Sequence, residues 1–360
     1  MNITASMVKE LREMTGAGMM ECKKALTETD GNMEAAVDVL KKSGAAKAEK
    51  KASRIAAEGI ARFATDEKSA VIVEVNSETD FVAKNEVFQS FVQDIADKAL
   101  ASGLNGGKNG EDVEALVEKS GLKDIIIEKT ATIGEKLSFR RFERVSGDCV
   151  ATYIHAGGKI GVAVAGNGAC DDECKAALNN VAMQIAAMNP TYISRSEISA
   201  DELAKMKDIT IESALNDPAT LPKNILSNFA NKAIADSMLS AEDVAIYEEK
   251  KSTQYLFNFL SKEAKAAIAS VGIAAKADVL NDKTFAGLVE GRVSKQLKEI
   301  CLLDQTYVKA EDGKQSVAKY LESVNKNLSI ASFIRFEVGE GMEKKNENFA
   351  EEVAKQMAGN

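Results

Sequence analysis

The chain has a single histidine, His155, which limits the chemistry that its 360 residues can perform. A metal site built on two histidines cannot form, and a Ser/His or Cys/His nucleophilic pair would have to use His155 itself. From the residues alone, His155 either contacts a partner or hydrogen-bonds within its own hairpin, and the second role is favoured. We therefore expect a protein that is not an enzyme, with no catalytic residue, no metal site and no cofactor.

A glycine-rich cluster follows the histidine, with the sequence Gly157-Gly158-Lys159-Ile160-Gly161. A phosphate-binding loop would need four residues between its glycines and a Ser or Thr directly after the lysine. Ile160 occupies that last position. The cluster therefore favours a hairpin turn over a nucleotide site.

The five cysteines are too few, and odd in number, for a secreted disulfide scaffold, so a reducing compartment fits best; they are Cys22, Cys149, Cys170, Cys174 and Cys301. Cys170 and Cys174 enclose three carboxylates. A tetrahedral zinc site would also need a second pair of thiols or a nearby histidine, and neither is present. This segment predicts a turn and the start of a helix.

Two consecutive methionines, Met19 and Met20, follow a loop that contains Gly16 and Gly18. Methionine is flexible and polarizable, which suits an adaptable contact surface. On composition alone, filling of a hydrophobic core is at least as good an explanation. Both interpretations stay open at this point.

A lone aromatic residue, Phe81, follows a predicted strand at 70–76 and a turn at 77–80. If the next helix began early, Phe81 would lie seven residues before Phe88 and join its buried face. Polar residues interrupt the apolar stripe between them, which favours a projecting Phe81 instead. The pattern alone does not decide between these two positions.

The charge balance argues against a dedicated nucleic-acid binder, because 46 basic and 55 acidic residues give a net charge of −9. The segment 41–54 is basic but lacks aromatic residues, so we interpret it as a solvated face or linker rather than an RNA site. No basic leader with an apolar core opens the chain, and no apolar run approaches the roughly 18 residues that span a bilayer. We expect a soluble, cytoplasmic protein that does not bind membranes.

The periodicity predicts several modules. Three short helices come first, and Ser43-Gly44 is expected to end the third. Two strand, turn and helix units follow, and the second loosely echoes the first. A helical segment interrupts the second unit, after which strand patterns resume at 299–308 and 332–338. The predicted boundaries are 1–54 for the N-terminal helices, 55–145 for the first subdomain, 146–190 with 291–342 for the second, 191–290 for the insertion and 343–360 for a terminal helical module.

Four segments resemble, in order along the chain, the signatures of the bacterial elongation factor Ts family; they are residues 11–26, 74–84, 153–162 and 333–344. The resemblance implies an α+β fold with an N-terminal domain of ubiquitin-associated type and a core of two related α+β subdomains. It also implies an inserted helical segment, for which a coiled coil is one form, and a C-terminal helical module.

The resemblance further implies a guanine nucleotide exchange factor for elongation factor Tu in protein synthesis, with no direct contact to nucleic acid. The segment that displaces the partner's magnesium ion would be Thr79, Asp80, Phe81 and Val82. The residues that bind the partner would be Met19, Met20, Lys23 and His155. A helical adaptor that binds another protein, and an RNA-binding protein that uses 41–54, are the alternative functions. Homodimerisation is left open.

Overall fold

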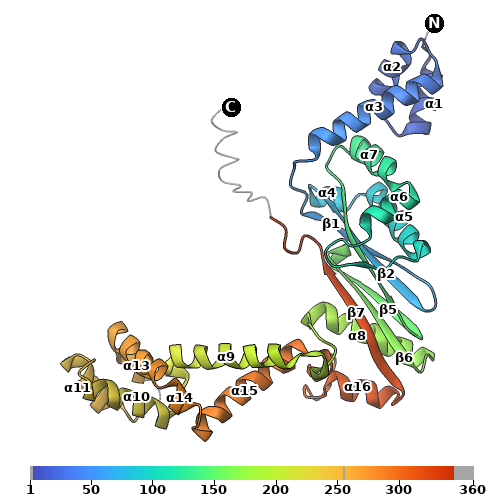
Figure 1. Ribbon diagram of the computed structural model, residues 1–360. Helices are drawn as coiled ribbons and strands as arrows, with labels where there is room; N and C mark the ends of the chain where they lie inside the picture. The colour runs from blue at the N-terminus through green and yellow to red at the C-terminus, as the bar shows by residue number, and fades with distance from the viewer. Residues whose placement is uncertain (1–2, 254–255, 344–360) are drawn as a thin grey trace. The chain divides into compact units, whose positions relative to one another are not determined.

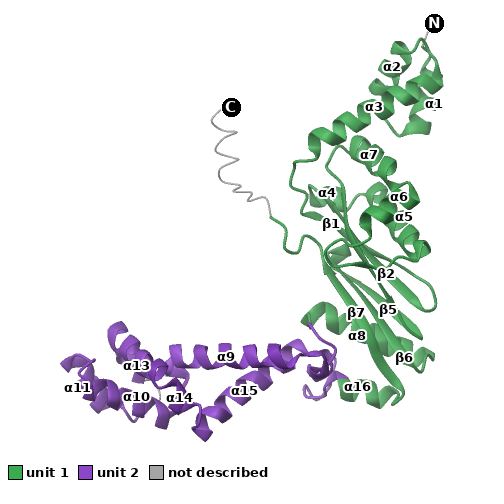
Figure 2. Ribbon diagram, in the orientation of Figure 1, with its two compact units in different colours: residues 1–189, 318–360 green, residues 190–317 purple. Residues whose placement is uncertain are grey.

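The computed structural model describes residues 3–253 and 256–343, and its contacts divide the chain into two compact units. Unit 1 contains residues 1–189 and 318–360, and unit 2 contains residues 190–317 (Figure 2). The fold is α+β, as predicted. The predicted C-terminal helical module lies, apart from its first residue, outside the described residues.

Three helices form the N-terminal module of unit 1: α1 (Ala5–Thr15), α2 (Met19–Glu28) and α3 (Met33–Lys51) (Figure 1). The side chains of Thr4 and Asn32 cap the first and third helices by accepting hydrogen bonds from backbone N–H groups. Leu11, Cys22 and Leu26 are fully buried in the small core that the helices share. Each of the three helices therefore contributes one apolar face to the core of this module.

The third helix is longer than predicted, because α3 continues past Ser43-Gly44 to Lys51. The expectation that Gly44 ends it is wrong. A Cβ on Gly44 would lie 3.4 Å from the Cβ of Ala131 on a neighbouring helix, so the glycine here allows two helices to approach closely. Most of the basic segment 41–54 is consequently helical.

The first sheet is antiparallel with strand order β1-β2-β4-β3. Its strands are β1 (Glu58–Thr65), β2 (Ser69–Ser77), β3 (Gly106–Gly107) and β4 (Ser138–Ser146). The helices of this part are α4 (Asp80–Ala83), α5 (Glu86–Ser102), α6 (Val113–Ser120) and α7 (Leu122–Ile133). Phe88, Phe91 and Ile95 on α5 are buried against one face of the sheet, as the helical stripe predicted.

The second sheet has the order β5-β6-β7 and is also antiparallel. Its strands are β5 (Cys149–His155), β6 (Ile160–Gly168) and β7 (Leu328–Glu337), with the 3₁₀ turn Ala156–Gly158 between the first two. Helix α8 (Asp172–Met188) covers it, and α16 (Val317–Val324) precedes β7. The predicted hairpin at the glycine cluster is confirmed.

The two sheets pack face to face, and β2 is buried on both sides. Val71, Val73 and Val75 pack toward the helices, whereas Ala70 and Ile72 pack toward the second sheet. Successive side chains of a strand point to opposite faces, so this burial explains why residues 70–73 of β2 are all apolar.

Unit 2 is a helical segment with its own core, centred on the buried rings of Phe229, Tyr247 and Phe285. Its helices are α9 (Ala200–Asn216), α10 (Lys223–Ala235), α11 (Ala241–Lys250), α12 (Leu256–Phe259), α13 (Lys262–Ala274), α14 (Lys276–Val279) and α15 (Lys283–Ile300). The predicted boundary at 290 falls inside α15.

The strand pattern predicted at 299–308 is wrong. Residues up to Ile300 belong to α15, and a 3₁₀ turn follows at Leu302–Asp304. Cys301 makes only an isolated bridge, to Tyr192. The short apolar run marks the buried end of a helix, a case that periodicity alone does not separate from a buried strand.

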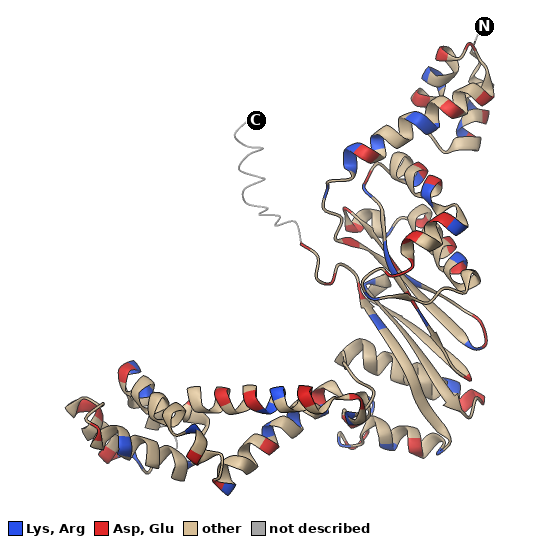
Figure 3. Cartoon of the chain, viewed as in Figure 1, with Lys and Arg blue, Asp and Glu red and all other residues tan. Residues whose placement is uncertain are grey.

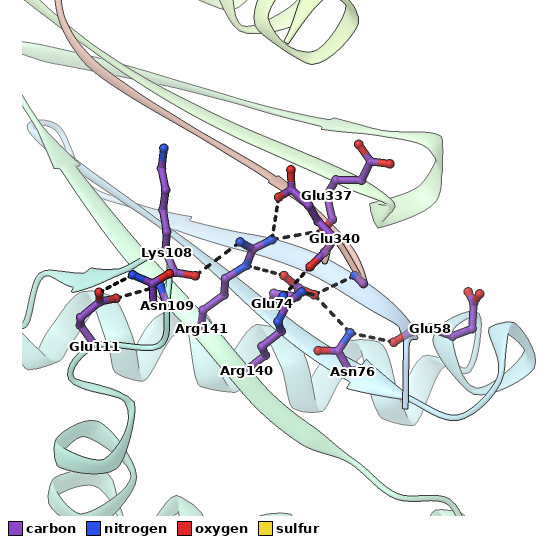
Figure 4. A network of polar contacts seen from close by, with 11 residues as sticks. Glu58, Glu74, Asn76, Lys108, Asn109, Glu111, Arg140, Arg141, Glu337 and Glu340 are labelled. Carbon is purple, nitrogen blue, oxygen red and sulfur yellow. Dashed lines mark hydrogen bonds and ion pairs between the residues drawn. The ribbon is translucent and has the colours of Figure 1, made fainter. Parts of the chain in front are cut away.

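A buried carboxylate, that of Glu74 in β2, joins the two sheets in unit 1 (Figure 4). It accepts hydrogen bonds from Arg140 Nη1 at 2.9 Å and Arg141 Nε at 2.6 Å on β4, and from the backbone N–H of Gly339 at 2.9 Å. Asn76 Nδ2 donates a further bond at 3.2 Å. A charge without solvent exposure is tolerated when such partners satisfy it.

Arg141 extends this network to the end of β7. Its guanidinium lies 4.2 Å from the centre of the Phe336 ring and donates to the backbone oxygen of Glu337 at 3.2 Å. It also pairs with Glu340 at 3.3 Å. Strands β2, β4 and β7 are therefore held by one set of charged groups.

We expect Glu74→Gln to lower the free energy of unfolding of unit 1 by about 3 kcal/mol, because Arg141 would keep a buried charge without its main partner. Hydrogen exchange of β2 peptides across a urea series measures this unit separately from unit 2. Asp94→Asn is the matched control: its side chain is 47% exposed and pairs with Lys98, which is 31% exposed, so loss of this ion pair should cost less than about 1 kcal/mol. Equal effects of the two variants would contradict the prediction.

Candidate functional site

A single helical turn, α4, follows β2 and carries the four residues predicted to act on a partner's metal ion. Thr79 is its N-cap, and the Thr79 hydroxyl accepts a hydrogen bond from the N–H of Val82 at 3.4 Å. The Val82 side chain packs partly buried against the core of the first sheet, and Ala83 is buried. The apolar residues of the turn, Val82 and Ala83, therefore fix it to the core of the first sheet.

A glutamate distant in sequence, Glu135, fixes the start of this turn. Its carboxylate accepts hydrogen bonds from the N–H groups of Glu78 at 3.1 Å and Thr79 at 3.0 Å, and from the Thr79 hydroxyl at 2.6 Å. Glu78 returns the interaction, since its carboxylate accepts from the N–H of Lys136 at 2.6 Å. Two loops 56 to 58 residues apart in sequence are thus clamped reciprocally.

Phe81 projects from this clamped turn, because 80% of its surface is exposed. The interpretation that placed it on the buried face of the next helix is therefore wrong. Asn85 explains the difference: its side chain caps α5 by accepting from the N–H groups of Val87 and Phe88, so α5 begins after Phe81. An exposed phenylalanine on a fixed turn is a feature typical of a contact residue.

Charged side chains lie next to Phe81 on the α4 turn. Asp80 pairs with Lys84 at 2.7 Å, and this hydrogen bond, with a smaller contribution from Lys159, lowers the pKa of Asp80 below its ordinary value. Asp80 therefore stays ionised at neutral pH. A negative charge next to Phe81 is well placed to compete for a cation or for a basic group of a partner.

The His155 hairpin lies at the same end of the core as α4. Ser77, two residues before Thr79, is paired with Glu58 at the start of β1, and Glu58 forms an ion pair with Lys159 of the hairpin. A Cβ on Gly158 would lie 2.9 Å from the Cβ of Ile60, so the hairpin rests directly on β1. The first strand thus positions both turns.

His155 itself is exposed at the end of β5. Its Nδ1 lies 3.1 Å from the hydroxyl of Tyr153, and the two ring centres are 5.9 Å apart. The hydrogen bond within the hairpin, which the residues alone favoured, is present. Since the ring also remains accessible, a contact with a partner stays a prediction.

The methionines of the N-terminal module are exposed rather than buried: Met19 by 56% and Met20 by 77%. They begin α2, and Lys23 is exposed one turn after Met20. Core filling is therefore excluded for both methionines. These residues lie on a different module from α4 and the His155 hairpin, so they form a second surface.

The basic segment 41–54 makes several internal contacts. Lys47 pairs with Glu21, Lys51 donates to the backbone oxygen of Thr130, and Arg54 pairs with Glu78 at 3.3 Å. In the colouring of Figure 3 this segment is mainly basic, since it has six Lys or Arg residues and one acidic residue, Glu49. These contacts favour a structural role for the segment.

Sequence inspection did not find Glu135, Lys136 and Glu58, although they position the predicted residues. No local pattern marks them, because each acts across more than 15 residues of chain. The one available signal is Gly134, whose left-handed backbone at φ +89° ends α7 and turns the chain toward Glu78.

Two absences apply to the described part of the chain. No group of three or more His, Cys, Asp or Glu side chains there is arranged to hold a metal ion. Among the same residues, no helix combines the length and the apolar character needed to cross a membrane.

Comparison with known proteins gives matches of two kinds, to a protein family and to individual proteins. The model of the family described as Elongation factor TS matches residues 78–272 and 258–340, which include the α4 turn, Glu135 and the His155 hairpin. The chain is also similar to elongation factor Ts of Clostridioides difficile (strain 630), with 42% identity over 367 aligned positions that cover 99% of each protein. The second match includes the N-terminal module.

We expect Glu135→Ala to loosen the α4 turn, because the N–H groups of Glu78 and Thr79 would lose their acceptor. Amide exchange at these two residues should become at least about tenfold faster, and the unfolding free energy of unit 1 should fall by about 1 kcal/mol. Hydrogen exchange with peptide mapping measures both. Glu128→Ala, which removes a half-exposed carboxylate of α7, is the control, and unchanged exchange in Glu135→Ala would contradict the clamp.

Proposed function

The chain belongs to the elongation factor Ts family and is a translation elongation factor; on that premise we propose that it is the guanine nucleotide exchange factor for elongation factor Tu. The observation that carries the proposal is Phe81, 80% exposed on a turn that Glu135 and Val82 hold in place. Such a side chain can act as a wedge, because the α4 turn that carries it is held in place when Phe81 contacts a partner.

The proposed mechanism is electrostatic. GDP and Mg²⁺ bind elongation factor Tu together because the cation offsets the charge of the phosphates. Phe81, flanked by Thr79, Asp80 and Val82, displaces the groups that hold the ion. GDP then loses its charge compensation and dissociates faster.

Binding of the factor and of the nucleotide is coupled reciprocally. If the factor weakens GDP binding by a given ratio, GDP must weaken binding of the factor by the same ratio. GTP, which also binds with Mg²⁺, therefore releases the factor when it loads. The cycle needs no proton transfer and no covalent intermediate, so it requires no enzymatic group on this chain.

Separate surfaces divide the work in this proposal. Met19, Met20 and Lys23 on α2 supply a flexible apolar contact with a charged rim, which suits an adaptable docking surface. His155, exposed at the end of β5, contacts another domain of the partner. Binding energy from these surfaces brings the α4 turn to the nucleotide site.

Stopped-flow release of a fluorescent GDP analogue from elongation factor Tu tests the function directly. We expect the release rate to rise at least about a hundredfold in the presence of micromolar full-length protein, because loss of Mg²⁺ removes several kcal/mol of phosphate stabilisation. Binding without acceleration would favour the adaptor function. Neither binding nor acceleration would contradict the proposal as a whole.

Phe81→Ala should reduce the maximal exchange rate by at least about tenfold while the Kd for elongation factor Tu changes less than about threefold. The reason is that the wedge acts on the nucleotide site whereas binding is spread over several surfaces. Phe259→Ala is the matched control, since it removes a 50% exposed phenylalanine from unit 2 and should change neither quantity. An equal loss of binding and exchange in Phe81→Ala would contradict this division.

A further inference from the structure

A second set of contacts holds the far end of the α4 turn, the end that follows Phe81. The amide nitrogen of Gln89, in the first turn of α5, donates a hydrogen bond to the backbone oxygen of Ala83 at 3.3 Å. The amide oxygen of Gln89 accepts from Arg62 Nη2, on β1, at 3.0 Å. Glu135 binds the opposite, N-terminal end of the turn, so these contacts are separate from its clamp.

The donors and acceptors fix the direction of both hydrogen bonds. An arginine side chain has only donors, and a backbone oxygen only accepts. The Gln89 amide therefore satisfies both neighbours in one orientation, with its oxygen toward Arg62 and its nitrogen toward Ala83. A hydrogen bond from a charged donor is stronger than one between neutral groups. Arg62 thus holds the amide in the orientation that binds α4.

The His155 hairpin packs over this arginine. A Cβ on Gly158 would lie 3.3 Å from Arg62 Nη1 and 2.9 Å from the Cβ of Ile60. Burial lowers the pKa of Arg62 below its ordinary value, yet an arginine stays protonated at neutral pH. Arg62 is therefore a charged, partly buried donor that contacts both α5 and the hairpin.

Helix α4 depends on such contacts because it has only four residues. Short helices are unstable without tertiary support. The last carbonyls of a helix also lack partners within it, and Gln89 supplies one for the Ala83 carbonyl. Loss of this bond lets the backbone after Phe81 open more often, so the ring loses part of its fixed direction.

We propose that Arg62 and Gln89 are positioning residues for nucleotide exchange, which hold the C-terminal end of the α4 turn and so keep Phe81 projecting. This inference rests on the proposed function of Phe81. Neither residue has to touch the partner or its nucleotide, since Gln89 acts through the Ala83 backbone and Arg62 acts through Gln89. With Glu135 at the other end, both ends of the turn are bound.

Gln89→Glu tests the proposal with almost no change of volume. A glutamate still accepts from Arg62, but at neutral pH it has no donor for the Ala83 oxygen. Gln93→Glu is the matched control, because Gln93 lies one turn later on the same helix and donates to the backbone oxygen of Phe63 on β1 at 3.0 Å. Each variant loses one such bond, and only Gln89→Glu loses it at α4.

The first measurement is amide exchange of the free, full-length chain. The N–H groups of Lys84 and Asn85 donate to backbone oxygens within the turn at 3.2 and 2.9 Å. Exchange at these two amides should become about fivefold faster in Gln89→Glu, the ratio expected for loss of one hydrogen bond. It should stay unchanged in Gln93→Glu. Unchanged exchange in Gln89→Glu would overturn the proposal.

The second measurement is release of a fluorescent GDP analogue from elongation factor Tu. The maximal rate should fall about fivefold in Gln89→Glu, while the Kd changes less than about twofold. In the Phe81→Ala background the same substitution should have no further effect, because Gln89 acts only through Phe81. Additive losses of rate, or an equal loss of rate and binding, would indicate a general loss of structure and overturn the proposal.

Arg62→Met is a second variant that leaves the Gln89 amide in place but removes the donor that orients it. It should also lower the maximal rate, and it should add nothing to the effect of Gln89→Glu. A parent chain that does not accelerate GDP release would overturn the exchange function and with it this role. A fast parent chain with an equally fast Gln89→Glu variant would overturn only the positioning role.

Discussion

The buried carboxylate of Glu74 has no contact with solvent, and it links strand β2 to strand β4 and to the segment after β7. Arg140 and Arg141 on β4 neutralise it, and the N–H of Gly339 binds it from the segment after β7. Hydrophobic contacts between sheets are not directional, so they permit small sliding movements. Paired charges in a dry interior fix the relative position of three strands, because any displacement leaves a charge uncompensated.

That fixed core matters because the proposed site depends on one projecting side chain. The Phe81 ring is exposed in the free protein, so it contributes little hydrophobic free energy to folding. What it gains is support: Glu135 holds the backbone before it, and Val82 packs into the core after it. A phenylalanine on a mobile loop would change position when it met a partner. Phe81 keeps its position because its turn is bound to Glu135 and packs on the sheet that contains β2.

Much of this structure could be predicted from the sequence where the determining interactions are local. The hairpin at Gly157-Gly158 depends on neighbours within a few residues. The exposure of Phe81 has a local cause, since the Asn85 cap starts α5 after it, but the support of its turn comes from the distant Glu135 and could not be predicted in this way.

Other features depended in the same way on distant partners. Gly44 predicted a helix end because its packing partner, Ala131, is 87 residues away. The acidic residue inside the apolar strand β2 carried no local sign of the arginines that neutralise it. The resemblance to the family supplied the candidate residues. The contacts that position them, such as those of Glu135 with Thr79, are found only in the folded structure.

The placement of unit 2 between β6 and β7 has a consequence for synthesis of the chain. Strand β6 pairs with β7 over about 170 residues of sequence, so the second sheet cannot close until nearly the whole chain has left the ribosome. The entropy cost of that closure falls if the insertion folds first, since the N–H of Thr191 donates to the backbone oxygen of Ile300 at 2.8 Å and brings the ends of the insertion together. If the insertion folds first, its more than one hundred residues act as a short connection. Strand β6 then pairs faster with β7 once β7 has been synthesised.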